Sequence, residues 1–210
     1  MLEGKKYEIR GVVPLYLHNG QMVDPLNPYS KAMKKVTSKR TKTDEDHEAM
    51  ARIEWEGGFY FDGDAPATPE DIPTEYRGNI VMPTHCIEAM LRNAAAKTKG
   101  GVTKKDFASA VFVEGDFLPL DCDADPSDLN ELFALGKFST RVPVKVGQQR
   151  VMRTRPFFTR WGLKFEVRYV TDLANESEID EIVETAGIQV GLCDWRPKFG
   201  RFEVVSASQS

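Results

Sequence analysis

The segment 195–202 combines aromatic and cationic side chains in a way that suits a single-stranded nucleic acid. Aromatic rings stack on nucleobases, cations pair with phosphates, and glycines such as Gly191 and Gly200 let a backbone approach a phosphate closely. The alternative is a tight turn whose rings fill the core, and Phe202, at the start of a strand, is the ring expected there. The candidate contacts are Trp195, Arg196, Lys198, Phe199 and Arg201.

Two further segments are basic, although the formal net charge of the chain is −4. Residues 31–42 contain six cations and no acid, and residues 141–168 contain eight cations and one acid, Glu166. Most charge runs are solvated faces. Two such runs in an acidic chain nevertheless predict separated charged surfaces, and the cations are expected to converge on folding into one track for a polyanion. The candidate residues are Lys34, Lys35, Lys39, Arg40, Arg150, Arg153, Arg155 and Arg160.

Acidic clusters offer an alternative chemistry. Asp24, Asp62 and Asp64, or the cluster at 121–125, could hold Mg²⁺ for phosphodiester cleavage. Asp121, Asp123 and Asp125 also imitate the opening of a calcium loop, but proline and leucine stand where glycine and glutamate are required. Solvated acidic turns are the simpler interpretation. The sequence therefore predicts no catalytic residue, no metal and no cofactor.

The three cysteines, Cys86, Cys122 and Cys193, are far apart in the sequence and form no CxxC pair. They predict neither a disulfide framework nor a zinc site. His85 precedes Cys86, but neighbouring residues on a helix point about 100° apart. A nucleophile and base made of these two residues is therefore not expected.

The hydrophobic pattern of the first half predicts strands and helices in alternation. A strand is expected at 7–13, a basic amphipathic helix at 29–36, and a second helix capped by Thr43 and Asp46. A hairpin is expected around Gly57 and Gly58, and a helix capped by Thr84 is expected to run to about residue 97.

The second half continues in the same manner. Residues 107–120 predict one strand, or two bent at Gly115, and a brief helix follows residue 125. The segment 141–155 is expected to form a basic hairpin, followed by a strand at 163–169 whose apolar residues alternate. A helix capped by Ser177 and Asp180 is expected to end at Gly187, and a last strand spans 201–205.

This order of elements predicts an α+β fold with a ferredoxin-like (RRM-like) βαββαβ core. Two helices would cover one face of a four-stranded antiparallel sheet and leave the other face available. The chain is interpreted as one domain, 1–210, with two insertions. One, 17–78, carries the basic helix and a hairpin, and the other, 121–158, carries a short helix and a basic extended arm.

Two stretches resemble the RAMP superfamily, specifically the backbone subunits that line up along guide RNA in CRISPR effector complexes. The first is the run VMPTHC at 81–86 leading into the helix at 87–94. The second extends from residue 153 through the strand at 163–169 and the acidic helix to Gly187, Gly191 and the segment 196–202. The run DPLNPYSKAMKK and the residues around Trp195 also resemble uncharacterised phage and prophage proteins, so a phage-encoded relative is expected.

The resemblance implies that Thr84 and His85, at the start of a helix, contact phosphate. The separated charges and the C-terminal loop predict a non-catalytic protein that binds single-stranded RNA or DNA. The resemblance implies that copies lie side by side along the strand as a homo-oligomer or filament. An interaction or assembly protein that binds no nucleic acid remains an alternative. The start of the sequence reaches no long apolar run, so no export signal and no membrane association are expected. The expected location is the cytoplasm, that of the bacterial host if a phage encodes the protein.

Overall fold

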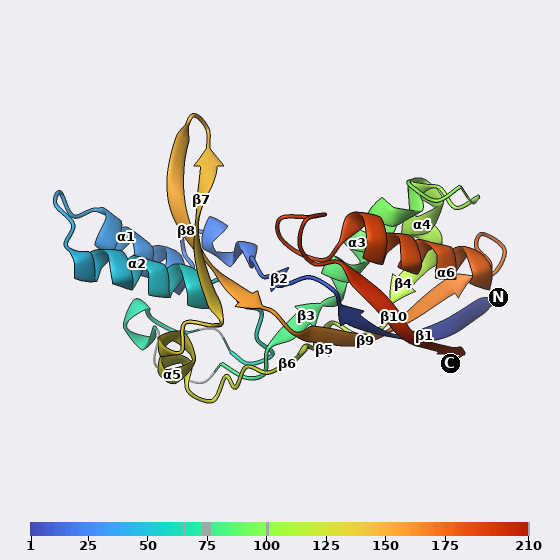
Figure 1. The fold of residues 1–210 in the computed structure, drawn as a ribbon, viewed down its shortest axis with the longest axis horizontal. Helices are drawn as coiled ribbons and strands as arrows, with labels where there is room; N and C mark the ends of the chain where they lie inside the picture. The colour runs from blue at the N-terminus through green and yellow to red at the C-terminus, as the bar shows by residue number, and fades with distance from the viewer. Residues whose placement is uncertain (65, 73–76, 100, 210) are drawn as a thin grey trace. The chain divides into compact units, whose positions relative to one another are not determined.

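The computed structural model describes residues 1–64, 66–72, 77–99 and 101–209 and divides the chain into two compact units (Figure 1). The sheet unit comprises Met1–Tyr16, Val81–Asp123 and Thr159–Ser210, and the hairpin unit comprises Leu17–Ile80 and Ala124–Phe158. Both mix helices with antiparallel strands, which confirms the α+β class. The hairpin unit is formed by nearly the same residues as the two expected insertions. That these residues are insertions into a family core stays a prediction.

The sheet unit contains a sheet whose strand order is β10-β1-β9-β4, with β6 also paired to β9. Every pairing in it is antiparallel. Strands β3 and β5 form a separate antiparallel pair. The strands of the unit are β1 (Leu2–Gly11), β2 (Leu15–Tyr16), β3 (Val81–Pro83), β4 (Val111–Val113), β5 (Phe117–Pro119), β6 (Asp121–Cys122), β9 (Trp161–Val170) and β10 (Phe202–Gln209).

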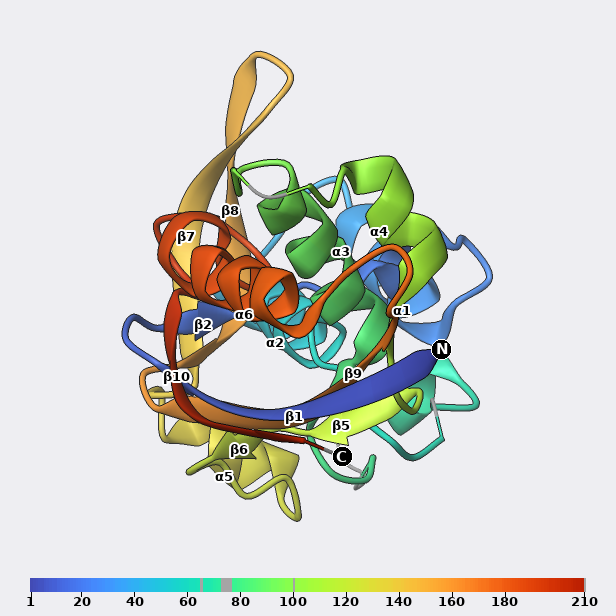
Figure 2. The ribbon, with the colours of Figure 1, turned by 90° about the vertical axis from the view of Figure 1, so that its right-hand side faces the viewer.

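Helices cover one face of this sheet (Figure 2). They are α3 (Thr84–Ala95), α4 (Lys104–Ala110) and α6 (Glu176–Thr185), the last continued by a π-helical turn, Ala186–Val190. Alternate residues of β9, including Leu163, Phe165 and Val167, are buried, as their spacing predicts. Tyr7 and Ile9 of β1 are buried as well, and the helix-covered core is built from these two central strands.

The opposite face of the sheet carries a ladder of ion pairs. Glu8 pairs with Lys164 at 3.4 Å, Lys6 with Glu166 at 3.9 Å, and Arg168 with Glu166 at 2.8 Å. These charges sit on neighbouring β1 and β9 positions, where the register sets Lys6 opposite Glu166 and Glu8 opposite Lys164. Lys6, Lys164 and Arg168 on this face therefore have acidic partners, and β1 and β9 present no aromatic platform on it.

Lys5 ties β1 to the first turns of α6. Its ammonium donates to Glu176 and, at 2.8 Å, to Asp180, which also accepts from the Tyr7 hydroxyl at 2.8 Å. Only 6% of Lys5 is exposed. Burial acts to lower the pKa of Lys5, but the hydrogen bonds with Asp180 and Glu176 outweigh it and raise the pKa.

We expect Lys5→Met to lower the free energy of unfolding by about 1–3 kcal/mol at pH 7, the range for a lost charged hydrogen bond. The stabilisation that accompanies a raised lysine pKa is fully present below the unfolded value of 10.5 and is lost as the pH rises through the higher folded value. The difference in unfolding free energy between wild type and Lys5→Met should therefore narrow as the pH rises above 10.5 in urea titrations. A difference that stays constant above that pH would contradict the assignment.

The hairpin unit packs helices against a long β-hairpin. Its elements are the 3₁₀ helices Gly20–Val23 and Pro69–Asp71, the helices α1 (Pro28–Thr37), α2 (Asp44–Glu56) and α5 (Leu129–Ala134), and the strands β7 (Ser139–Val146) and β8 (Gln149–Phe158). The capping box of Thr43 and Asp46 is confirmed. Trp55 and Phe59 are fully buried, and the Trp55 indole N–H donates to the Phe138 carbonyl at 2.9 Å.

Several expected boundaries are wrong, each for a local reason. Residues 51–55 belong to α2 rather than to a hairpin, because Ile53 and Trp55 complete its buried side. Residues 104–110 are helical, since Thr103 and Asp106 form a capping box. The cap of α6 is Asn175 with Glu178, not Ser177 with Asp180.

The helix α6 also does not stop at Gly187, because the π-helical turn carries it on to Gly191. In the described ranges, no helix combines the length and the apolar composition needed to cross a bilayer.

Candidate nucleic-acid interface

The loop between the π-helical turn and β10 holds an aromatic cluster in the sheet unit. The Tyr16 ring lies 5.0 Å from the Trp195 ring and 4.5 Å from the Phe199 ring, centroid to centroid. The Asp194 N–H donates to the Tyr16 carbonyl at 3.2 Å, which fixes the loop to β2. The rings of Trp195 and Phe199 are only partly exposed. They therefore pack chiefly on each other and on Tyr16, a partner that the sequence analysis did not identify.

The cations of this loop differ in their surroundings. Arg196 and Lys198 are exposed, and the Lys198 ammonium lies 5.4 Å from the centroid of the Phe199 ring. Arg201 is partly buried beside Phe202, which is buried as expected. Arg196 and Lys198 are thus the loop residues best placed to meet a phosphate.

Gly191 and Gly200 close the loop on itself, which corrects the interpretation that they leave room for a phosphate. The φ angles are +78° at Gly191 and +72° at Gly200. A Cβ atom on Gly200 would lie 2.0 Å from the Leu192 carbonyl oxygen, and the Leu192 N–H donates to the Gly200 carbonyl at 2.8 Å. The glycines are required because two backbone segments of the same loop touch here.

We expect Gly200→Ala to destabilise the loop by at least about 1–2 kcal/mol, the cost of a left-handed backbone for a residue with a Cβ, with the steric overlap adding to it. Amide hydrogen exchange should become faster at residues 191–201 and stay unchanged in β7 and β8. Gly147→Ala is the matched control, since Gly147 also has a positive φ, +60°, but nothing lies within 4 Å of its Cβ position. Equal loop protection in both variants would contradict the close approach.

Thr84 does not cap α3. Its hydroxyl donates to the Gly115 carbonyl at 2.9 Å, and the N-cap residue is Pro83, which makes no side-chain cap hydrogen bond. The expected cap is wrong because the loop at Gly115 competes for the hydroxyl. His85 is exposed on the first turn of the helix, and its contact with phosphate stays a prediction.

The β7–β8 hairpin carries a second group of cations in the hairpin unit. In Figure 1 its tip extends away from α1 and α2 of the same unit. The register places Lys145 opposite Arg150 and Arg141 opposite Thr154, which sets Arg141, Lys145 and Arg150 on one face. All three cations are exposed. Like charges directly opposite on paired strands are destabilising, so this face favours a bound anion.

The other face of the hairpin points its cations at the helices of the same unit. Arg153 forms an ion pair with Glu54 of α2, whose second carboxylate oxygen accepts from the Thr154 N–H at 2.9 Å. Arg155 lines a pocket of about 420 Å³ together with Arg153 and Met33. Arg153 thus anchors the hairpin, while Arg150, three residues earlier, faces solvent.

The cations of the 31–42 segment divide in the same way. Lys35 pairs with Glu70, and Lys39 pairs with Asp46 of the capping box. Lys34 and Arg40 are exposed, in and just after α1. Two of the four candidate cations in this segment therefore already have carboxylate partners.

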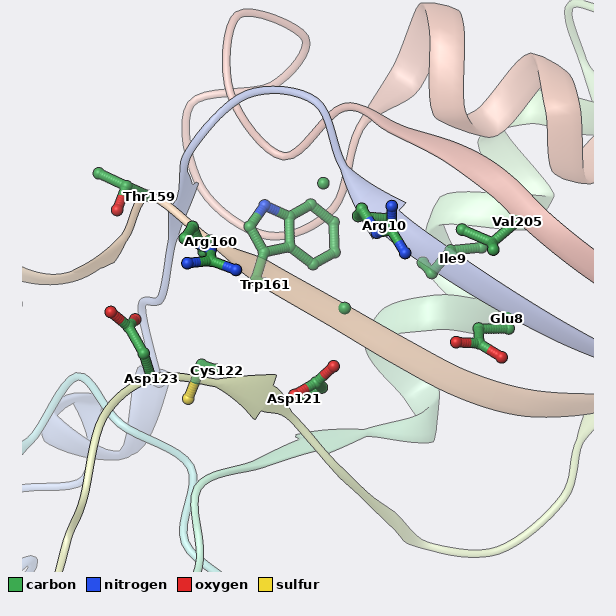
Figure 3. A pocket seen from close by; sticks show the side chains of 12 residues that line it. Glu8, Ile9, Arg10, Asp121, Cys122, Asp123, Thr159, Arg160, Trp161 and Val205 are labelled. Carbon is green, nitrogen blue, oxygen red and sulfur yellow. The ribbon is translucent and has the colours of Figure 1, made fainter.

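Arg160 lines a pocket of the sheet unit in which carboxylates outnumber guanidinium groups (Figure 3). The pocket is about 320 Å³ in volume, and Trp161 and Gly162 form part of its wall. Such a mixed lining does not select for a phosphate. The charged residues that line it are Glu8, Arg10, Asp121, Asp123 and Arg160.

The remaining acidic candidates serve local structure. Asp62 accepts from the Asn79 N–H at 2.7 Å, and Asp24 accepts from the Leu26 N–H at 2.8 Å. The Ser127 side chain and N–H hydrogen-bond to Asp125 and lower the pKa of its carboxyl. Across residues 1–64, 66–72, 77–99 and 101–209, no three histidine, cysteine, aspartate or glutamate side chains are grouped so as to hold a metal ion.

The candidate residues fall into two groups, one in each unit. Thr84, His85, Arg160 and the loop 195–201 belong to the sheet unit, and the cations of α1, its flank and the hairpin belong to the hairpin unit. Within the sheet unit the structure brings the loop residues 195–199 together around Tyr16. On the exposed hairpin face only Arg150 was a candidate, and its neighbours there, Arg141 and Lys145, were not singled out from the sequence. One continuous track across both units stays a prediction.

Comparisons with known proteins find likenesses of fold among solved structures. No family model matches the sequence, and no curated protein matches it. Among solved structures, a chain from "Cryo-EM structure of the Type III-B Cmr-beta bound to cognate target RNA" is similar with a TM-score of 0.49 and 10% sequence identity. The alignment covers 99% of this chain and 60% of that chain. The expected phage origin stays a prediction.

Proposed function

We propose that this protein binds single-stranded nucleic acid, RNA or DNA, without catalysing a reaction on it. The observation that carries the proposal is the exposed hairpin face on which Arg141, Lys145 and Arg150 gather, with no acidic residue opposite them in the register. Between Lys137 and Phe165 the chain contains no aspartate or glutamate. A polyanion is the partner that relieves the repulsion among these cations.

We further propose that the core of the sheet unit is ferredoxin-like. The strand order β10-β1-β9-β4 supports it, because these are the fourth, first, third and second of the four strands in chain order. Helix α3 lies in the connection from β1 to β4, and α6 lies in the connection from β9 to β10. This arrangement matches the βαββαβ pattern, and the RAMP resemblance of the sequence is part of the same proposal.

The binding mode follows from the surfaces of the two units. On the open sheet face Lys6, Lys164 and Arg168 have acidic partners, so the hairpin supplies the main electrostatic contact. Arg196 and Lys198 provide a second group of exposed cations, beside partly exposed rings on which a base could stack. Contacts of this kind recognise backbone charge and base planes rather than sequence.

The test is the binding of labelled single-stranded RNA and DNA of mixed sequence, measured by fluorescence anisotropy at several salt concentrations. If about five phosphates are contacted, the log-log salt slope should be on the order of −3 to −4. Absence of binding to either strand at low salt overturns the proposal. Cleavage of either strand during incubation with Mg²⁺ or Mn²⁺ overturns its non-catalytic part.

Side-by-side assembly along the strand is the last part of the proposal. The number of bound copies, measured by light scattering, should then rise in steps as the oligonucleotide is lengthened from about 10 to about 60 nucleotides. One copy per strand at every length would exclude it.

A further inference from the structure

The fold of the sheet unit brings together two cysteines that are far apart in the sequence. Cys86 lies in the first turn of α3, and Cys193 lies in the loop that follows Gly191. The Cys193 thiol donates to the thioether sulfur of Met82 at 3.5 Å, and it is also hydrogen-bonded to Cys86. Three sulfur-bearing side chains thus meet where the loop touches the start of the helix.

The backbone holds Cys193 in place. Its φ angle is +61°, a left-handed conformation that costs energy for a residue with a Cβ and persists only where the surroundings impose it. The neighbouring Leu192 N–H donates to Gly200, and the Asp194 N–H donates to Tyr16. The position of the thiol is therefore fixed from both sides.

We propose that Cys86 and Cys193 form a reversible disulfide under oxidation by a peroxide, which links the 191–201 loop covalently to helix α3. Cys86, Cys122 and Cys193 are all in the reduced thiol form in this structure. The proposal does not depend on nucleic-acid binding, and it identifies a modification site that the sequence analysis did not foresee.

The chemistry assigns different roles to the two cysteines. The hydrogen bond with Cys86 and burial raise the pKa of the Cys193 thiol well above its ordinary value, which makes it a poor first nucleophile. Cys86 is partly exposed at a helix N-terminus, where a thiolate is stabilised. The Cys86 thiolate attacks one peroxide oxygen, the O–O bond breaks, and the departing hydroxide takes up a proton to become water.

The second step closes the link. Sulfur of Cys193 attacks the sulfenic sulfur of Cys86, the S–O bond breaks, and the hydroxyl leaves as water with the thiol proton of Cys193. The two thiols lose two electrons in total, and the peroxide is reduced to two molecules of water. A thiol reductant reverses the link by exchange.

The experiment uses the full chain, reduced, desalted and treated with hydrogen peroxide, then blocked with N-ethylmaleimide and digested with trypsin without reduction. The cleavage pattern places the three cysteines in separate peptides, 78–92, 106–137 and 169–198, because the bond after Arg196 precedes proline. Mass spectrometry should find 78–92 joined to 169–198, and dithiothreitol should separate them. Cys122 should carry the blocking group.

Three serine variants test which cysteines form the disulfide. Cys86→Ser and Cys193→Ser should each abolish the joined peptide, whereas Cys122→Ser, the matched control, should leave its yield unchanged. Blocking of both Cys86 and Cys193 after peroxide treatment of wild type would overturn the proposal, and so would a preferred link through Cys122 or between two chains. The mapping on wild type decides the matter even if a variant folds poorly.

Discussion

Replacing Arg141, Lys145 and Arg150 together by glutamine should weaken the binding of single-stranded nucleic acid by on the order of 100-fold at ~0.1 M salt. Each lost phosphate contact removes about 0.7 from the log-log salt slope, so three contacts remove about 2. The electrostatic contribution to the affinity is taken to vanish at ~1 M salt. Over the tenfold range from ~1 M to ~0.1 M salt, a change of 2 in the log-log slope therefore changes the affinity by about 100-fold. Anisotropy titrations at four salt concentrations measure both quantities.

The matched control removes three cations that already have acidic partners. Lys6, Lys164 and Arg168 lie on the open sheet face and pair with Glu166 and Glu8. Replacing all three by glutamine changes the net charge of the protein by the same amount as the hairpin variant. We expect the affinity of this control to stay within about threefold of wild type, because these cations contribute little field at the surface. Equal losses in the two triple variants would show that binding follows net charge and not the hairpin.

Much of the fold could be predicted from local signals. The strand at 163–169 has strict alternation, and α1 has apolar residues spaced three and four apart, so both patterns state which side is buried. The helix at 104–110 was missed although Thr103 and Asp106 carry the capping-box signal, because Phe107, Val111 and Val113 resemble a strand.

The candidate site was less accessible to prediction, since the partner of a charge is a fact of tertiary structure. Arg150 and Arg153 look alike in the sequence, but Arg153 meets Glu54, nearly a hundred residues earlier in the chain. In the sequence, Gly200 is compatible with a loop that binds phosphate. In the structure, the Leu192 backbone occupies the space next to it. The contact between Tyr16 and Trp195 could not be predicted, because neither the spacing nor the composition of the two segments relates them.

Glu54 holds the hairpin to α2, so Glu54→Ala should both destabilise the hairpin unit and weaken nucleic-acid binding. Glu54 is only 7% exposed, and its carboxylate is the acceptor for the Thr154 N–H and the partner of Arg153. A buried N–H without an acceptor costs about 1–3 kcal/mol, and the unpaired guanidinium adds to this. We expect a loss of about 3 kcal/mol in the free energy of unfolding, measured by urea titration.

Two companion variants separate the contributions. Glu54→Gln keeps an acceptor for the Thr154 N–H and should cost about 1 kcal/mol, whereas Glu48→Ala, on an exposed position of the same helix, should change stability by no more than about 0.5 kcal/mol. A double-mutant cycle of Glu54→Gln with Arg153→Gln isolates the ion pair. If Glu54→Ala were as mild as Glu48→Ala, the contact between α2 and β8 would not anchor the hairpin. The exposed cations would then lack the rigid support that the proposed binding face requires, since a loosely held hairpin loses entropy when it is ordered on a strand.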